Sequence, residues 1–194
     1  FSFISYILLI IGLTFGMIWM ISRQLEFELT ELANQDQLTK ILNRRGVNFF
    51  TDREFSKMKR GNTALAMVMT DLDHFKHLND RYGHQAGDEV LIEFTRLISS
   101  NLRPHDIFGR IGGEEFLIIL SNTDVEQALA LAERLRDLVE MHIFKVNGHH
   151  IHITASSGVA NYTSRADTFE KLIPFVDRAL YLSKQNGRNR VTYL

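Results

Sequence analysis

The opening segment of the chain carries no charged side chain. It reads FSFISYILLIIGLTFGMIWMIS from Phe1 to Ser22, and the first charge is Arg23. As an α-helix this segment would be about 33 Å long, enough to cross a hydrocarbon core of ~30 Å. Trp19 lies near its far end, where interfacial aromatic residues collect. A transmembrane helix over residues 1–22 is therefore predicted.

Two other structures also produce an apolar segment. A signal peptide needs a basic start and a small-residue cleavage site, and residues 1–22 show neither. A buried core helix is rarely apolar on all sides in so small a domain. The membrane helix is favoured over both.

Residues 23–35 are amphipathic. Leu25, Leu29 and Leu32 are spaced by four and then three residues, which fits a short coiled-coil seam with glutamates outside. Two heptads are fewer than the three or more that establish a coiled coil. A lone linker helix therefore remains the alternative.

Residues 36–194 have the size and pattern of one globular domain. A formal net charge of −1 gives no indication of a general nucleic-acid binder, which would be markedly basic. The absence of cysteine excludes disulfides and thiolate metal sites. Because the chain does not begin with Met, we expect it to be the end of a longer protein.

Strand and helix patterns alternate from residue 64 onward. The predicted elements are, in order, a strand at 64–73, helices at 74–83 and 86–102, a hairpin at 106–120, a helix at 125–141, a hairpin at 143–160 and a helix at 169–189. Together with a final strand, this order predicts an α+β domain in which helices pack on a sheet.

Two aspartates end the first predicted strand. Asp71 and Asp73 flank Leu72, and residues i and i+2 of a strand point the same way. Both carboxylates are therefore expected to face one site. Taken alone, such a pair is also common among surface acids and helix caps.

The sequence GRIGGEEF predicts a tight hairpin turn. Gly112 and Gly113 are expected to supply positive φ angles and to let a phosphate approach the backbone. The turn also carries Glu114 and Glu115. If this hairpin neighbours the first strand, three or four carboxylates converge, a ligand set that suits Mg²⁺ bridging protein carboxylates and substrate phosphates.

Five motifs occur in register with a known family. They are DQLTKILNRR at 36–45, DLDHFKHLND at 71–80, GHQAGDEVL at 83–91, RIGGEEF at 110–116 and SKQNGRN at 183–189. Throughout residues 36–194 the chain resembles the GGDEF family of diguanylate cyclases. The resemblance implies a central, mostly antiparallel sheet flanked by helices, similar to nucleotide cyclases and polymerase palms. It also implies condensation of two GTP molecules into cyclic di-GMP.

The resemblance assigns the catalytic roles. Asp71, the backbone carbonyl of Leu72 and Glu114 are the implied metal ligands, for Mg²⁺ or alternatively Mn²⁺. Glu114 is also the implied acceptor of the 3′-hydroxyl proton, with Glu115 as its rival. Lys76 is implied to stabilise charge on the phosphates in the transition state.

The resemblance also assigns the substrate contacts. Asn79 and Asp88 match guanine-reading positions, since a carboxylate accepts from both N1–H and N2–H of guanine. Without the motif, Asp88 after Gly87 would be interpreted as a helix N-cap. His84 matches a substrate-contacting position. Lys184 and Arg188 match a basic pair that reaches the phosphates; as isolated residues they would be solvated surface charges.

One further motif is regulatory. Arg103 and Asp106, in RPHD, match the product-inhibition motif RxxD of the family, upstream of the GGEEF hairpin. Arg134 aligns with a second arginine of that pocket. The alternative for Arg134 is pairing with Glu133 or Asp137 on an exposed helix face.

These features predict an active, membrane-anchored cyclase with a cytoplasmic catalytic domain at the inner (cell) membrane. Each domain would bind one GTP with its cation, and two domains must face each other, so a homodimer is expected. Two other classes stay open: a nucleotide-sensing module that binds cyclic di-GMP without turnover, and a structural dimerisation unit. The sequence names neither the input signal, the resting oligomeric state nor the downstream effectors.

Overall fold

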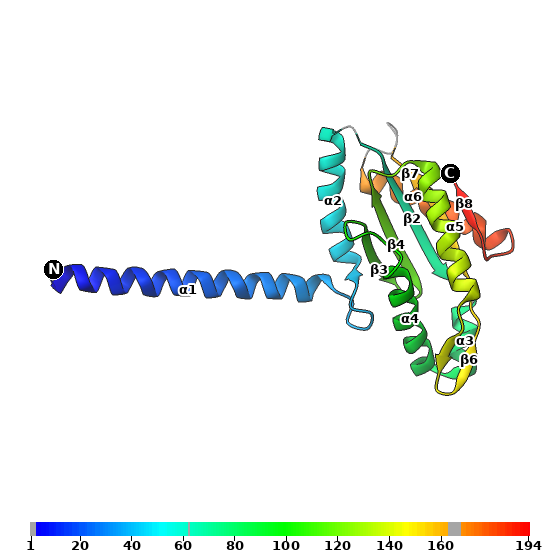
Figure 1. The fold of residues 1–194 in the computed structure, drawn as a ribbon, viewed down its shortest axis with the longest axis horizontal. Helices are drawn as coiled ribbons and strands as arrows, with labels where there is room; N and C mark the ends of the chain where they lie inside the picture. Colours follow the sequence, from blue (N-terminus) through cyan, green and yellow to red (C-terminus); the bar gives the residue numbers. More distant parts are fainter. Residues whose placement is uncertain (1–2, 62, 163–167) are drawn as a thin grey trace.

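The structure is a computed structural model that describes residues 3–61, 63–162 and 168–194. The side chains of residues 4 and 26–32 lie outside this description, and with them Leu29 and Leu32 of the predicted coiled-coil seam. A long N-terminal helix projects from an α+β domain (Figure 1).

Helix α1, Phe3–Asn34, continues without a break through both the predicted membrane helix and the predicted linker. Its segment Ser5–Leu25 is long and apolar enough to cross a membrane, and none of it is buried against the domain. Asn34 at its end is buried. There the Nδ2 of Asn43 donates to the carbonyl oxygens of Ala33 and Gln35 at 2.9 and 3.0 Å, which fastens the helix end to the domain.

The domain is built on a six-stranded sheet with the order β1-β3-β4-β2-β7-β8. The central pairings β3–β4, β4–β2 and β2–β7 are antiparallel, and the outer pairings β1–β3 and β7–β8 are parallel. The strands of this sheet are β1 Leu42–Asn43, β2 Leu65–Leu72, β3 Ile107–Gly112, β4 Glu115–Ser121, β7 Ala155–Asn161 and β8 Val191–Tyr193. The predicted α+β class and mostly antiparallel sheet are confirmed.

Helices cover both faces of the sheet (Figure 1). Alternate residues of β2 point to opposite faces. Ala66 and Val68 join the cluster that contains α4 and α5, whereas Met67 and Met69 join the cluster that contains α2 and α6. The helices are α2 Arg44–Gly61, α3 Phe75–Tyr82, α4 His84–Ser99, α5 Val125–Met141 and α6 Phe169–Gln185. Because β2 is buried along its whole length, its carboxyl end is a rigid place for polar side chains.

Two parts of the element prediction need correction. Helix α2 was not predicted, because its segment Arg44–Gly61 is largely polar and buries only a narrow face. The segment 143–160 holds three strands rather than two. Strands β5, Phe144–Val146, and β6, His149–Ile151, form a separate hairpin, and the chain then enters β7 of the main sheet.

Candidate active site

The carboxyl end of β2 meets the GGEEF hairpin. Asp71 is 5% exposed and lies opposite Glu115 in the antiparallel register of β2 and β4. The Leu72 N–H donates to the carbonyl oxygen of Glu114 at 3.3 Å. The sheet therefore brings Asp71, Glu114 and Glu115 together, as the motif spacing predicted.

The surroundings of Asp71 oppose its ionisation. The pKa of this carboxyl is raised to about 6. Burial is the main cause, the nearby Lys184 ammonium acts in the opposite direction, and the charges of Glu114 and then Glu115 add to the rise. Lys184 Nζ lies 2.7 Å from Asp71 Oδ2. Lys184 thus compensates only part of the free-energy cost of burying the ionised Asp71 carboxylate beside Glu114 and Glu115.

The GGEEF turn differs in one detail from expectation. Gly113 has a φ of 42° in the left-handed region, as predicted, but Gly112 is not among the positive-φ residues and instead pairs with Glu115 as the last residue of β3. A single left-handed residue is enough because the register shift between Arg110 and Gly112 tightens the turn.

A side-chain brace holds this turn from the start of the domain. The Nε of Arg110 donates to the Gly113 carbonyl oxygen at 2.7 Å, and its Nη1 donates to Asp36 Oδ1 at 3.1 Å. Asp36 also accepts from the N–H and hydroxyl of Thr39. The motif DQLTKILNRR, which was noted without a role, therefore supplies a support for the hairpin.

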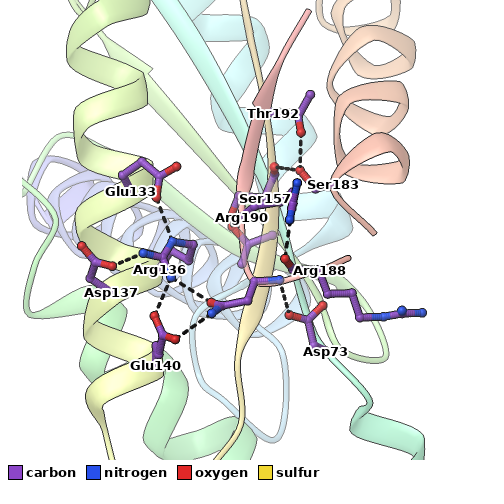
Figure 2. Close-up of polar contacts among 12 residues, drawn as sticks. Asp73, Glu133, Arg136, Asp137, Glu140, Ser157, Ser183, Arg188, Arg190 and Thr192 are labelled. Atoms are coloured by element: carbon purple, nitrogen blue, oxygen red, sulfur yellow. Dashed lines mark hydrogen bonds and ion pairs between the residues drawn. The ribbon is translucent and has the colours of Figure 1, made fainter. Parts of the chain in front are cut away.

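Asp73 has different surroundings from Asp71, contrary to the expectation that both face one site. Strand β2 ends at Leu72, so the alternation of a strand no longer fixes the direction of the next residue. The carboxylate of Asp73 accepts from the hydroxyls of Thr154 and Ser156, both at 2.7 Å, and from the Asn189 N–H at 3.0 Å. Figure 2 shows Asp73 close to the segment that carries Arg188 and Arg190.

The donor set at the end of β2 fits a hard divalent cation. Asp71, Glu114 and Glu115 offer oxygen atoms only, and Lys184 is the cation that the structure places against Asp71. Among the described residues, no three acidic or histidine side chains already stand in a geometry that holds a metal. The carboxylates therefore fit a cation that arrives with further oxygen ligands, as a triphosphate provides.

The predicted base-reading residues lie on two helices that approach closely. A Cβ at Gly87 would stand 1.9 Å from Asn79 Oδ1, so a larger residue there would displace the Asn79 side chain from its position between α3 and α4. Asn79 Oδ1 is buried without a hydrogen-bond partner in the described structure. The N-cap of α4 is Gly83, and Asp88 lies exposed within the helix, so the N-cap interpretation of Asp88 is wrong. His84 is exposed at the first turn of α4.

The three predicted phosphate-binding cations occupy different places. Lys76 is exposed in the first turn of α3, after His74 in a left-handed conformation. Lys184 lies in the last turn of α6 against Asp71. Arg188 is exposed in the turn that follows. The last turn of α6 is fixed by Ser183, whose hydroxyl donates to the Ser157 carbonyl oxygen at 2.7 Å.

The three predicted product-inhibition residues line one cavity of about 350 Å³, between the end of α4, the RPHD turn and α5. The Arg103 N–H donates to Asp106 Oδ2 at 2.9 Å, which closes the turn, and Asp106 Oδ1 is buried without a hydrogen-bond partner among the described residues. Arg134 donates to the side-chain and backbone oxygens of Asn101, at 3.0 and 3.1 Å. The alternative pairing of Arg134 with Glu133 or Asp137 is wrong, because Arg136 binds both acids.

Comparison with known proteins identifies this arrangement. The family profile described as "Diguanylate cyclase, GGDEF domain" matches residues 33–190. The chain belongs to the GGDEF diguanylate cyclase family.

Individual relatives agree with the family match. A diguanylate cyclase of Vibrio cholerae is 40% identical over 167 residues, which is 86% of this chain and 51% of that protein. Diguanylate cyclase A of Treponema denticola is 46% identical over 128 residues, 66% of this chain and 34% of that protein. The chain thus spans about half or less of the length of these relatives.

Solved structures show the same fold. The coiled coil and GGDEF domain of DgcB from Caulobacter crescentus, in complex with c-di-GMP, has a TM-score of 0.85 at 29% identity, over 95% of this chain and 97% of that one. The active GGEEF domain of a diguanylate cyclase from Vibrio cholerae has a TM-score of 0.73 at 38% identity, over 78% of this chain and 96% of that one.

Sequence reasoning missed several residues that support the site. The brace from Asp36 through Arg110 and the contacts of Asn189 lie within motifs that were recognised, so their position in those motifs was the available signal. Arg136 gave no such signal, because one arginine among acids on a helix is indistinguishable from a solvated surface charge.

Proposed function

We propose that this chain is an active diguanylate cyclase that condenses two GTP molecules into cyclic di-GMP and releases two pyrophosphates. The observation that carries the proposal is the place of Asp71, a buried carboxylate beside Glu114 and Glu115 that only Lys184 compensates in part; burial is the main cause of its raised pKa of about 6. A fold would not keep such a group for stability, and perturbed carboxylates cluster at functional sites.

Each half of the reaction forms one phosphodiester bond. The 3′-oxygen of one GTP attacks the α-phosphorus of the other, and the bond from that phosphorus to the pyrophosphate oxygen breaks. The proton of the 3′-hydroxyl passes to Glu114 or to Glu115; both are half-buried at the turn. Lys76, Lys184 and Arg188 neutralise charge on the phosphates.

The residues that would hold Mg²⁺, or alternatively Mn²⁺, are Asp71, the carbonyl of Leu72 and Glu114. When bound, the cation neutralises triphosphate charge and favours attack at the α-phosphorus. The raised pKa of Asp71 supports this assignment, because a cation would stabilise the ionised carboxylate.

Asn79, Asp88 and His84 form the proposed base site. The oxygen of Asn79 is buried beneath Gly87, which favours contact between a base and the amide nitrogen as donor. The exposed Asp88 carboxylate is free of an N-cap role and can accept from guanine N1–H and N2–H. Adenine lacks this pair of donors, so ATP should react up to ~10⁴-fold more slowly than GTP.

The product is proposed to bind in the cavity lined by Arg103, Asp106 and Arg134. Asp106 supports this proposal through its buried Oδ1, which accepts no hydrogen bond from the described residues, and the exposed Arg103 can donate in a bidentate manner to phosphate or guanine. Binding there inhibits only if it favours a non-productive arrangement of two domains.

The apolar helix α1 is proposed to anchor the catalytic domain at the inner (cell) membrane, with the domain in the cytoplasm where GTP is present. Its exposed apolar surface over Ser5–Leu25 is the supporting observation. Pairing of two such helices would raise the local concentration of catalytic domains, which the two-domain reaction needs.

Incubation of the purified chain with GTP and Mg²⁺, followed by chromatography of the products, tests the proposal. We expect cyclic di-GMP and pyrophosphate in a ratio of about one to two, as the balance of the two attacks requires. Binding of cyclic di-GMP without any turnover of GTP would favour the nucleotide-sensing module instead. Absence of any GTP-dependent thermal shift would favour the structural dimerisation unit.

A further inference from the structure

The turn that carries Arg188 has an unusual backbone. Arg188 and Asn189 both lie in the left-handed region, with φ values of 64° and 44°, directly after Gly187 with a φ of 110°. Asparagine tolerates this conformation, whereas an arginine occupies it at an energetic cost. Such a conformation persists only where surrounding contacts hold it.

Asn189 provides those contacts with all of its polar groups except its carbonyl. Its backbone N–H donates to Asp73 Oδ2 at 3.0 Å, and its Nδ2 donates to Glu140 Oε1 at 2.8 Å. Its Oδ1 accepts from Arg136 Nη1 at 2.9 Å. The turn is therefore tied to the end of β2 on one side and to helix α5 on the other.

Arg136 is itself held firmly on α5. It donates to Glu133 at 2.8 Å and to Glu140 at 2.6 Å, and it also pairs with Asp137. Its side chain is only 15% exposed, although all three acids are close to half exposed. Figure 2 shows these acids surrounding Arg136 beside the turn. A long arginine side chain that is fixed on several sides is a rigid support for Asn189.

The side chain of Arg188 has no comparable support. The Arg188 N–H caps α6 by donating to the Ser183 carbonyl oxygen at 3.0 Å, but the guanidinium has no hydrogen-bond or ion-pair partner in the part of the chain that the structure describes. The direction of this exposed side chain is consequently set by its backbone. That backbone is held by the Ser183 carbonyl oxygen, by Arg190 Nε, which donates to the Arg188 carbonyl oxygen at 3.2 Å, and by the neighbouring Asn189.

We infer that Asn189, clamped by Arg136 and Glu140, is a positioning residue that directs Arg188 toward the triphosphate of the substrate. Asp73 completes the clamp from the end of β2, two residues beyond Asp71, so one strand end positions both Asp71 and the phosphate-binding turn. This inference rests on the proposed function, because it assigns Arg188 to the substrate of that same site.

A double-mutant cycle on the full chain in detergent tests the clamp. Asn189→Gly removes both side-chain contacts but keeps a residue that accepts the left-handed backbone. We expect it to weaken binding of α,β-methylene-GTP with Mg²⁺ by about tenfold, as loss of one well-aimed charged contact does. In an Arg188→Ala background the same change should alter the dissociation constant less than about twofold, because the residue being positioned is gone.

Two further variants separate positioning from general stability. Glu133→Gln removes a charge but keeps an oxygen that accepts the Arg136 Nε bond, and it does not touch Asn189, so it should leave nucleotide affinity unchanged. Asn189→Asp should weaken binding by itself, because it places a carboxylate against Glu140. Adding Glu140→Gln exchanges donor and acceptor across the same 2.8 Å contact and should restore most of the affinity. If Asn189→Gly does not fold, this rescue pair provides the test.

Equal losses from Asn189→Gly with and without Arg188, or failure of the rescue, would overturn the clamp. Cyclic di-GMP formation is followed in parallel. Binding of the analogue without cyclisation of GTP would contradict the proposed function alone, and the affinities would still decide the clamp. Absence of analogue binding by the unaltered chain would contradict both.

Discussion

Asp71 and Asp73 are two residues apart, both buried, and opposite in character. Asp73 is 3% exposed and accepts three hydrogen bonds, two from hydroxyls and one from a backbone N–H. Asp71 is 5% exposed, has one lysine as its ion-pair partner and faces two further carboxylates. Burial raises the pKa of Asp71 to about 6, against an ordinary value of 3.8.

The difference separates structural from functional use of the same side chain. A carboxylate whose hydrogen bonds come from its own chain stabilises the fold, as at Asp73. A buried carboxylate with a single such partner and two further carboxylates beside it, as at Asp71, destabilises the fold until something outside the protein supplies more positive charge. The comparison therefore predicts opposite effects on stability when each aspartate is neutralised.

The largest expected effect is on the stability provided by Asp73. Asp73→Ala leaves the hydroxyls of Thr154 and Ser156 and the Asn189 N–H without their acceptor, and should lower the free energy of unfolding by about 3 kcal/mol. Denaturant titration of the full chain in detergent measures this loss. Asp80→Ala, at an exposed acid of α3, is the control and should change stability by less than about 0.5 kcal/mol. Equal stability of the two variants would remove the contrast.

The next effect concerns the carboxylates that face Asp71. Glu114→Ala should reduce the rate of cyclic di-GMP formation at least about a hundredfold, because charge stabilisation at such a site is worth several kcal/mol. The circular dichroism spectrum should stay unchanged, since Glu114 is only half-buried. Near-normal activity in a folded variant would refute the assignment, and a larger loss in Glu115→Ala would transfer the role of base to Glu115.

A smaller effect is expected at the product cavity, whose proposed role is feedback inhibition and which contains neither aspartate. Arg103→Ala removes a donor of the cavity but leaves Asp71 and Glu114 untouched. It should keep catalysis and raise the product concentration needed for inhibition at least tenfold, equivalent to about 1.4 kcal/mol of lost binding. Inhibition curves at equal GTP measure this shift. Superimposable curves would make RPHD a surface turn only.

Much of the fold followed from local patterns in the sequence. The predicted helix at 125–141 coincides with α5, because apolar residues at helical spacing run along its whole length; in the structure the Asp124 capping box fixes its start. Helix α2 was missed because most of its residues are polar, and only the tertiary structure shows that Phe55 and Met58 are buried. The prediction merged strand β7 with the preceding hairpin, since the alternation of buried and more exposed residues runs from Ile151 to Ala155 and leaves no gap between the two.

The candidate site was predictable to the level of motifs and no further. Spacing placed Asp71 beside the GGEEF turn, and the antiparallel register of β2 and β4 agrees. Strand parity failed for Asp73 because the strand ends one residue earlier. The contacts among Arg136, Glu140 and Asn189 join α5 to a turn about fifty residues away in sequence, and no local pattern encodes such a contact.

The raised pKa of Asp71 predicts how the stability of the fold changes with pH. Because its folded-state pKa is raised, the native protein binds this proton more tightly than the unfolded chain does. Asp71 therefore lowers stability as pH rises from about 4 to about 6, and the full cost is present above that range. In EDTA, the melting temperature of Asp71→Asn relative to that of the unaltered chain should therefore increase as the pH rises from about 4 to about 6. A constant difference across this range would contradict the raised pKa.

The contrast between the two aspartates is tested most directly by Asp71→Asn at pH 7.5, measured by thermal unfolding in EDTA and by turnover of GTP with Mg²⁺. We predict a melting temperature about 2–4 °C above that of the unaltered chain, the shift that ~1 kcal/mol produces in a protein of this size. Cyclic di-GMP formation should fall at least about a hundredfold in the same preparation. A variant that melts lower than the unaltered chain, or that retains its activity, would contradict the claim that Asp71 serves function at the expense of stability.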